Sequence, residues 1–323
     1  MNKNDISDPM FDKMVLVSIL YYKNKLSQQE IARKLNISRP WVSKLLSRAE
    51  ELGIVKIEID SPAFGNSYLE KQLKLIYDIP YVGVINPYDH SRDYVSRAAV
   101  NYFVSQIKPD DVIGIGWGAS VSRFLRQMVS LYLPDTQIIP LAASFGTSAE
   151  TLPNYIAMQL ASKLGGTAHL LHVPAFCSSQ EEYDALISNE QTRQKISMAE
   201  HVDIAIAGIG SFTSSFLLRH NILSSEEVQE LKAANAIGDL LLQFIDKDGN
   251  PVNTEICRRI IKADIFEIKK NARTVIAMTE GKEKLEMVQA VLSRHLVDAF
   301  FTNEETAFAL LQAYDAGIPF RKS

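Results

Sequence analysis

Eight short apolar runs between residues 81 and 303 constrain the fold of this chain more than any other feature. They read YVGVI at 81–85, DVIGIGW at 111–117, TQIIPLA at 136–142, AHLLHVPA at 168–175, VDIAIAGIG at 202–210, GDLLLQFID at 238–246, RTVIAMTE at 273–280 and VDAFFTN at 297–303. Runs of this length and continuity are typical of strands that are buried on both faces. Amphipathic helical stretches separate them, which favours a mostly parallel sheet with helices on both sides. The pattern predicts a Rossmann-like, doubly wound α/β domain.

The chain is too long for one ordinary compact module and predicts a small domain followed by a larger one. It has 323 residues, and chains of this length usually divide. Turn-forming residues gather in the stretch Ser61-Pro62-Ala63-Phe64-Gly65-Asn66-Ser67, which is typical of a domain boundary. We therefore expect an N-terminal domain at 1–60, a linker at 61–67 and a second domain at 68–323.

The composition is that of an ordinary globular protein, with 46% hydrophobic and 22% charged residues. No run approaches the roughly 20 apolar residues that cross a bilayer, and the first residues lack the apolar core of a secretion signal. Cys177 and Cys257 have no partner at C-x-x-C spacing, which argues against a zinc or disulfide framework. We expect a cytoplasmic protein with no membrane partner, no metal and no cofactor.

A helix-turn-helix motif is predicted in the N-terminal domain. Apolar residues at helical spacing in 11–22 indicate a first helix. Ser27 and Glu30 form a capping-box pattern that opens a second, short helix. After a tight turn, Ser38 is placed as the N-cap of a third helix with Pro40 in its first turn, where a missing N–H costs nothing. Two short helices joined by such a turn place the second helix in the major groove of DNA.

The charge distribution supports DNA contact by this domain. The whole chain carries a net charge of −4, whereas the stretch from Lys23 to Arg48 holds seven basic residues against one acidic residue. A basic island on an acidic chain is typical of a phosphate-contacting module. The candidate DNA-binding residues are Gln28, Ser38, Arg39, Pro40, Trp41, Ser43, Lys44 and Ser47.

Two alternatives remain at this point. A helical hairpin with a solvated basic face would give the same charge pattern, and Trp41 could be a buried anchor instead of an exposed contact. Residues 54–59 alternate apolar and charged side chains like an exposed strand, which predicts a wing after the third helix.

Small and polar residues collect where several apolar runs of the larger domain end. Ligands of doubly wound sheets bind beyond the carboxyl ends of the strands. Glycine loops let backbone amides approach an anion, and a following helix adds a favourable dipole, so phosphate is the expected guest. The candidate residues are Gly116, Trp117, Gly118, Ala119 and Ser120, then Gly210 and Ser211, then Asp239 for sugar hydroxyls, and finally Glu280 and Lys284.

Other interpretations of these loops stay open. Residues 114–119 also satisfy the dinucleotide pattern G-x-G-x-x-A, but the acidic residue that should close the next strand is missing, because Asp135 precedes that strand. Tight packing alone would also select glycine, and each polar turn could be merely solvated.

The segments LSQQEIARKLNISRPWVSKLLSRAEELGIVKIEI, DVIGIGWGAS, GIGS, AIGDLLLQFIDKDGNPV, VIAMTEGKEK and FFTNEETAFALL occur in this order over nearly the whole chain. In this order they resemble the sugar-binding transcriptional regulators of the SorC/DeoR type. The resemblance implies a tetramer whose effector domain is similar to phosphosugar isomerases and deaminases, and whose affinity for operator DNA changes when a sugar phosphate binds. It also implies that the 116–120 loop, Gly210, Ser211 and Lys284 receive the phosphate and that Asp239 contacts the sugar.

The chain departs from the family pattern at two places that shape the expected pocket. Thr279-Glu280-Gly281 stands where members often have Ala-Gly-Gly, and Ala143-Ser144 stands where they often have Gly-Gly. The departures concern the identity of the effector.

We expect a non-enzymatic, DNA-binding regulator of carbohydrate metabolism; the alternative is a sugar-phosphate isomerase or deaminase with an accessory DNA-binding module. That chemistry needs an acid/base pair, often with histidine. Deaminase relatives have Gly-His after the glycine-rich strand end, whereas Gly210 is followed by Ser211-Phe212. His169 and His172 are expected on opposite faces of a strand, which makes a poor metal pair. A regulator that answers to a protein partner is a third reading.

Overall fold

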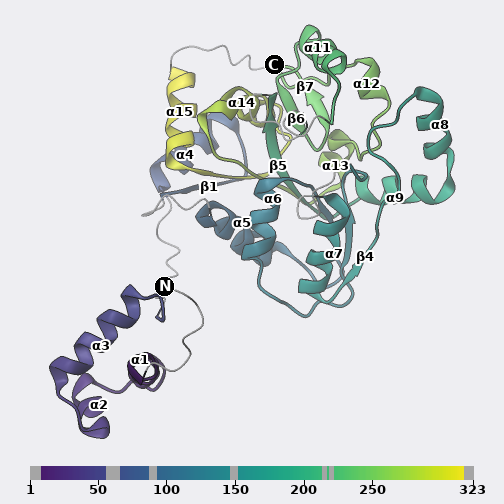
Figure 1. Cartoon of the computed structure of the whole chain (residues 1–323). Helices are drawn as coiled ribbons and strands as arrows, with labels where there is room; N and C mark the ends of the chain where they lie inside the picture. The colour runs from purple at the N-terminus through teal and green to yellow at the C-terminus, as the bar shows by residue number, and fades with distance from the viewer. Residues whose placement is uncertain are drawn as a thin grey trace. The chain divides into compact units, whose positions relative to one another are not determined.

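In the computed structural model, the chain forms two compact units, Met1–Pro62 and Ala63–Ser323 (Figure 1). The structure describes residues 9–55, 66–86, 93–145, 152–212, 217 and 222–315. Within these ranges, every helix is too short or too polar to cross a membrane.

The N-terminal unit is a bundle of short helices around one small core, as the helix-turn-helix pattern predicted. Its elements are α1 (Pro9–Ser18), which continues into the π-helical η1 (Ile19–Lys23), α2 (Gln28–Leu35) and α3 (Arg39–Glu51). Met14 and Val17 of α1 are buried against Ile31 of α2 and against Val42 and Leu45 of α3. The core is small because three amphipathic helices have only one apolar stripe each to bury.

Local hydrogen bonds fix where the helices of this unit begin. The Ser27 side chain accepts from the Glu30 amide at 3.3 Å, and the Glu30 carboxylate accepts from the Ser27 amide at 2.8 Å, so the predicted capping box is present. Asn36 ends α2 in the left-handed conformation (φ 51°), and the Ser38 hydroxyl accepts from the Trp41 amide at 3.3 Å. These contacts set the turn between α2 and α3. Most of the predicted wing, from residue 56 onward, lies outside the described residues.

The second unit is built on a parallel sheet with strand order β1-β9-β8-β5-β2-β3-β4. The strands are β1 (Tyr81–Ile85), β2 (Val112–Ile115), β3 (Gln137–Pro140), β4 (Thr167–Ala168), β5 (Ile204–Ser211), β8 (Thr274–Met278) and β9 (Ala299–Asn303). Alternate residues of each strand enter different cores. Ile204 and Ile206 of β5 join one core, and Ala205 and Ala207 join the other.

Helices cover both faces of the sheet, which confirms the doubly wound α/β prediction (Figure 1). One face carries α4 (Ser67–Tyr77), α9 (Glu190–Glu200), α13 (Ile265–Asn271), α14 (Leu285–Ser293) and α15 (Glu304–Asp315). The other face carries α5 (Asp93–Gln106), α6 (Ala119–Gln127) and α7 (Pro153–Leu164). The strands are therefore buried on both sides, as their continuous apolar sequence predicted.

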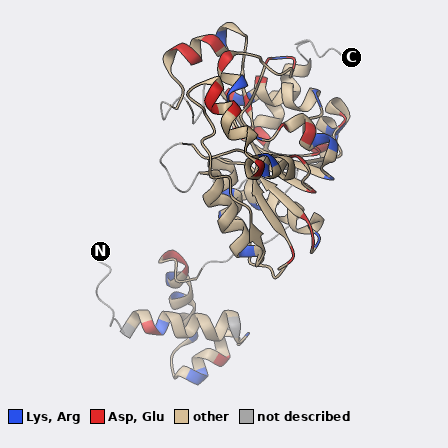
Figure 2. Ribbon diagram, turned by 90° about the vertical axis from the view of Figure 1, so that its right-hand side faces the viewer, with Lys and Arg blue, Asp and Glu red and all other residues tan. Residues whose placement is uncertain are grey.

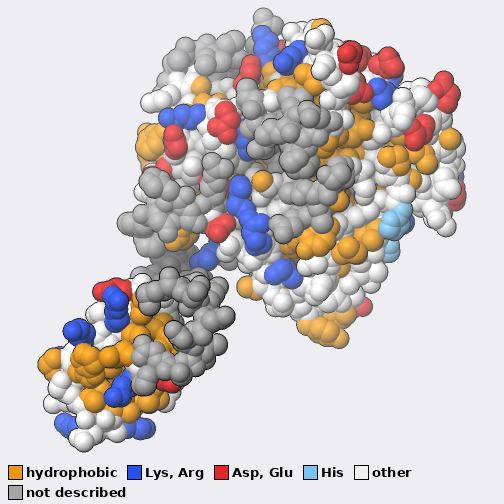
Figure 3. Space-filling model, viewed as in Figure 1, with side chains coloured by type: hydrophobic (Ala, Val, Ile, Leu, Met, Phe, Trp, Pro, Cys, Tyr) orange, Lys and Arg blue, Asp and Glu red, His pale blue; other side chains and the backbone are white. Residues whose placement is uncertain are grey.

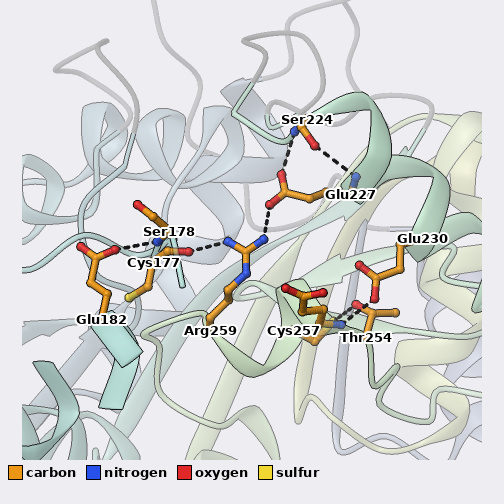
Figure 4. A network of polar contacts seen from close by, with 10 residues as sticks. Cys177, Ser178, Glu182, Ser224, Glu227, Glu230, Thr254, Cys257 and Arg259 are labelled. Carbon is orange, nitrogen blue, oxygen red and sulfur yellow. Dashed lines mark hydrogen bonds and ion pairs between the residues drawn. The ribbon is translucent and has the colours of Figure 1, made fainter. Parts of the chain in front are cut away.

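A third core cluster lies where the strands end, and a polar network ties its segments together (Figure 4). Its helices are α8 (Gln180–Ser188), α11 (Ser225–Ala233) and α12 (Glu255–Arg258). The Arg259 guanidinium donates to the Cys177 carbonyl and to the Glu227 carboxylate of α11, the latter at 2.6 Å. Glu227 also accepts from the Ser224 amide at 2.7 Å. One arginine thus joins three segments that are distant in sequence.

The run AHLLHVPA does not form the predicted strand beyond Ala168. Strand β4 has only two residues, Thr167 and Ala168; the His169 amide still donates to the Ile138 carbonyl at 2.8 Å, but at Leu171 a side chain takes the place of the sheet partner. The Asn154 amide donates to the Leu171 carbonyl at 2.8 Å and accepts from the Leu171 amide at 3.0 Å. The argument that His169 and His172 lie on opposite faces of a strand therefore does not hold. His169 instead lies 3.0 Å from the Gln137 side chain.

The run GDLLLQFID forms a hairpin instead of one more parallel strand. Strands β6 (Gly238–Leu240) and β7 (Gln243–Ile245) pair antiparallel, and β6 pairs antiparallel with the end of β5. The turn consists of Leu241 and Leu242, both with positive φ (55° and 62°). Non-glycine residues rarely adopt this conformation, and here burial of both leucine side chains offsets the backbone strain.

The predicted linker ends earlier than its sequence suggested. Helix α4 begins at Ser67, and Asn66 is its N-cap, accepting from the Leu69 amide at 3.2 Å. Asparagine reads as a turn former in sequence, but it is also a preferred N-cap residue. Asn66 and Ser67 of the predicted linker are thus the cap and the first residue of α4, within the second unit.

Candidate functional site

The sheet brings the predicted effector residues to the carboxyl ends of three neighbouring strands. Strand β5 lies between β8 and β2 in the sheet (Figure 1). The 116–120 loop follows β2, Gly210 and Ser211 end β5, and the segment 279–284 follows β8. Asp239 joins them because its strand β6 pairs with the end of β5. The four groups of residues thus meet at one edge, where ligands of this architecture bind.

The two glycines of the 116–120 loop have different surroundings. The Gly116 amide donates to the Ile206 carbonyl at 2.7 Å, and a Cβ added at Gly116 would lie 2.8 Å from Leu241 Cδ2 and 2.9 Å from that carbonyl oxygen. Gly116 is therefore a packing glycine. Gly118 has φ +93°, and none of the described residues lies within 4 Å of an added Cβ. It is buried and is the N-cap of α6 without a side-chain cap, and a helix start of this kind favours an anion.

An arginine that the sequence reasoning missed connects the loop to Glu280. The Arg123 guanidinium of α6 donates to the Ser120 hydroxyl at 3.3 Å and lies 3.8 Å from the Glu280 carboxylate. All three side chains are largely buried. The available signal was helical spacing, because Arg123 is three residues after Ser120 and faces the same side. A cation and an anion that pair in a buried site can exchange partners when a charged ligand enters.

Aromatic side chains flank the same loop. The Trp117 ring is perpendicular to Phe145 with centroids 4.6 Å apart, and Phe145 is perpendicular to Phe176 at 5.7 Å. Trp117 itself is half-buried. An aromatic face at the entrance to a polar loop suits the apolar face of a sugar ring.

Asp239 is a buried carboxyl group held close to the end of β5. It pairs with Gly210 in the sheet register, and a Cβ added at Gly210 would lie 2.9 Å from Asp239 Oδ1. Burial raises the pKa of Asp239 to about 6, and a hydrogen bond donated by the Leu242 amide at 3.1 Å opposes this rise. A desolvated carboxylate with unused acceptor capacity gains most from hydroxyl donors, which is what a sugar would supply.

The segment after β8 is a tight turn whose residues contact α15. Gly281 has φ +113°, and its amide donates to the Thr306 hydroxyl at 3.0 Å. Lys282 pairs with Glu305 at 3.1 Å. Lys284, which is half-buried, ends the 3₁₀ turn Lys282–Lys284 and is the N-cap of α14. A lysine at a helix N-terminus opposes the helix dipole, and an anion between them would relieve this.

The candidate DNA-binding residues lie on α3, at its N-cap and at the start of α2, and the ribbon of the N-terminal unit carries several lysine and arginine positions (Figure 2). Six of them are exposed, and Gln28 and Trp41 are half-buried; the exposed set is Ser38, Arg39, Pro40, Ser43, Lys44 and Ser47. The Lys44 ammonium lies 5.6 Å from the centroid of the Trp41 ring. Trp41 also packs against the small core and is only partly exposed, so its DNA contact stays a prediction. Apolar side chains are exposed on this unit as well (Figure 3), including Phe11 and Leu16 of α1.

An enzymatic site would need a metal ion or an acid/base pair among the residues that the structure describes. They contain no group of three or more histidine, cysteine or acidic side chains placed to hold a metal ion. At the end of β5, the position after Gly210 is the buried Ser211, which does not titrate near neutral pH.

Comparisons with known proteins cover both units. Residues 61–312 match the family described as "Putative sugar-binding domain", and residues 11–56 match the family "Winged helix-turn-helix DNA-binding". The sorbitol operon regulator of Klebsiella pneumoniae is 28% identical over 93% of this chain and 97% of the regulator. The deoxyribonucleoside regulator of Bacillus subtilis is 25% identical over 90% of this chain and 95% of its own. The crystal structure of the full-length sorbitol operon regulator SorC from Klebsiella pneumoniae superposes with a TM-score of 0.81 at 25% identity, covering 94% of this chain and 99% of that one.

Proposed function

The chain belongs to the SorC/DeoR-type family of sugar-binding transcriptional regulators, and on this premise we propose that it controls transcription of carbohydrate genes in response to a phosphorylated sugar. Relatives of similar length are named regulators of sorbitol and deoxyribonucleoside genes. The N-terminal unit binds operator DNA, and the second unit binds the effector.

One observation carries the proposal: an uncapped helix start, a buried carboxyl group and a lysine at a helix N-terminus meet at one sheet edge. Gly118 begins α6 without a side-chain cap, Asp239 pairs with the end of β5, and Lys284 begins α14. A phosphate suits the two helix starts, and sugar hydroxyls suit the carboxylate. A ligand that carries both a phosphate and sugar hydroxyls would contact the start of α6, Asp239 and Lys284.

The proposed effector site comprises the residues named from sequence together with Arg123. Its members are Gly116, Trp117, Gly118, Ala119, Ser120, Arg123, Gly210, Ser211, Asp239, Glu280 and Lys284. Gly116 acts by letting the β2 end pack closely on β5. Glu280 pairs with Arg123 in the ligand-free protein, so an incoming phosphate competes with Glu280 for the guanidinium.

The protein acts as a homo-oligomer, with the tetramer as the expected state, because one helix-turn-helix makes few base contacts. Tyr68 and Leu75 of α4 are 66% and 69% exposed, and Phe308 of the adjacent α15 is 50% exposed. Lys71 lies among them on α4 and Glu305 on α15, so a second copy related by a two-fold axis meets opposite charge. Phe308→Glu should lower the mass measured by sedimentation, whereas Gln191→Glu, at an exposed position in the first turn of α9, should not.

A thermal-shift screen tests the effector assignment. The purified protein is heated with the phosphates of glucose, fructose, ribose, deoxyribose and sorbitol and with each unphosphorylated parent, because a ligand at about 100 times its Kd adds about 2.7 kcal/mol of stability. A shift with one phosphate but not its parent is expected. Lys284→Ala should abolish the shift, and Lys247→Ala, an exposed lysine outside the site, should preserve it. A shift of equal size in Lys284→Ala would show that the site is misplaced.

A further inference from the structure

We propose that the first turn of α15 is a relay that connects the effector loop after β8 with Asn66, the first described residue after the interdomain segment. The relay consists of Glu304 and Thr306, which contact Asn66 and Gly281 respectively. This inference rests on the proposed function, because it concerns how the effector site influences DNA binding.

The effector side of the relay is a hydrogen bond between a turn and a buried hydroxyl. The Gly281 amide donates to Thr306 Oγ1 at 3.0 Å, and the Thr306 side chain has no exposed surface. The Lys284 amide closes the same turn by donating to the Gly281 carbonyl at 3.2 Å. A phosphate bound at Lys284 therefore acts on a turn that is bonded directly to α15.

The linker side of the relay is a short contact between residues 238 positions apart. Asn66 Nδ2 donates to Glu304 Oε1 at 2.6 Å. The same asparagine caps α4 through its Oδ1 atom, and its own amide donates to the Val84 carbonyl at 2.9 Å. Asn66 is thus held in the effector domain by contacts with α4, β1 and α15, and in sequence it follows the segment that leads from the DNA-binding unit. A change in the Glu304 contact alters the restraint on that point.

The two contacts lie on one rigid element. Glu304 and Thr306 are two residues apart, so about 3 Å of helix separates them along the axis. The Thr306 amide donates to Asn303 Oδ1 at 3.0 Å, which fixes the start of α15 at the end of β9. A displacement of the turn at Gly281 is therefore passed to Glu304 by a unit that moves as one body.

The relay contacts contribute little to the fold, so they can be removed selectively. Helix α15 is held by Ala307 and Leu310, and α4 by Leu69 and Leu73, all fully buried in the core on one face of the sheet. Packing of this kind outweighs single polar contacts. The two relay bonds can therefore be removed without dismantling the apolar packing that holds α4 and α15.

Two variants and their conservative partners test the relay. Glu304→Ala removes the acceptor for Asn66, and Glu304→Gln retains an oxygen acceptor. Thr306→Val removes the hydroxyl at nearly constant volume, and Thr306→Ser keeps it. Glu286→Ala removes an exposed carboxylate from α14 and serves as the matched control.

The measured quantity is the ratio of DNA dissociation constants with and without effector. The probes are the sugar phosphate that gives the largest thermal shift and a labelled duplex selected from a random pool by the wild-type protein. In Glu304→Ala and Thr306→Val this ratio should approach one, a loss of about five-fold or more, while the affinity for the sugar phosphate in the absence of DNA stays within about two-fold. The conservative variants and Glu286→Ala should retain the wild-type ratio. Hydrogen exchange at residues 66–70 should change on effector binding in the wild type but not in the two relay variants.

The outcomes separate the relay from the proposed function. Wild-type coupling in both Glu304→Ala and Thr306→Val overturns the relay alone. Outright loss of effector or DNA binding in these variants also overturns it, because the residues would then support the sites themselves. A wild-type protein whose DNA affinity does not respond to any phosphate of the panel overturns the proposed function, and the relay with it.

Discussion

Replacing Asp239 by asparagine should stabilise the unliganded protein and weaken its response to effector. Burial raises the pKa of this carboxyl group from 3.8 to about 6. Because the folded state holds the proton more tightly than the unfolded state, ionised Asp239 destabilises the fold. This destabilisation is absent at pH values below the pKa of Asp239 in the unfolded state. It is complete at pH values above its pKa in the folded state. A shift of about two units corresponds to about 3 kcal/mol.

The expected gain in unfolding free energy depends on the two groups of the asparagine side chain. Its amide oxygen still accepts from the Leu242 amide, but its NH₂ group needs a partner in the same buried site. We therefore expect a gain in unfolding free energy of about 2 kcal/mol near pH 8. Near pH 5 wild-type Asp239 is mostly protonated in the folded state, so the gain falls by about 1 kcal/mol. Loss of a charged acceptor for sugar hydroxyls should weaken effector binding about ten-fold or more.

Urea unfolding at the two pH values, followed by circular dichroism, measures the first effect, and titration calorimetry measures the second. Asp248→Asn is the control, because Asp248 is exposed in the turn after β7; it should alter neither stability nor its pH dependence. If the Asp239→Asn protein is no more stable than the wild type near pH 8, or if the gain is the same at both pH values, the carboxylate is not strained by burial as argued.

Three further predictions concern the loop, the cap and the DNA contacts. Gly116→Ala should lower the unfolding free energy by about 1–3 kcal/mol in urea, because the added Cβ meets the β5 backbone. Ser27→Ala should cost about 1 kcal/mol by breaking the capping box, seen as a lower thermal midpoint for the N-terminal unit. Replacing both Arg39 and Lys44 by alanine should weaken operator binding and reduce the slope of log K against log salt concentration by about two. Anisotropy titrations at several salt concentrations measure this slope. The control Lys13→Ala on α1 should leave the operator affinity nearly unchanged.

The helix-turn-helix could be predicted closely from sequence because capping hydrogen bonds between residues close in sequence fix where its helices begin. Ser27, Glu30 and Ser38 make the capping contacts that their spacing suggested. The sheet could be predicted in outline for a different reason, since strands buried on both faces must be apolar throughout. β1 matches its predicted run from Tyr81 to Ile85.

Elements that depend on distant partners could not be predicted. The strand after Ala168 is lost because Asn154, on another element, binds the Leu171 backbone. The β6–β7 hairpin could not be predicted because its turn has leucines at positions of positive φ, where glycine or asparagine is usual. In both cases tertiary contacts override the local preference.

The location of the candidate residues could be predicted because residues at the carboxyl ends of neighbouring parallel strands lie close together, whereas their binding of an effector stays a prediction. The glycine loop, Asp239 and Lys284 do lie at one edge of the sheet. Arg123 was missed because an arginine within an amphipathic helix looks like an ordinary surface residue, although its partner Glu280 is 157 positions away.

The chain has two tryptophans, and they lie in different units. Trp41 is half-buried on α3 beside Lys44, and Trp117 is half-buried in the loop beside Phe145. Indole emission depends on the polarity around the ring, so Trp117→Phe leaves an indole only on α3 and Trp41→Phe leaves one only in the 116–120 loop. The protein thus has its own optical reporter in each unit, and the order in which they respond to the proposed effector can be followed in stopped flow without any attached dye.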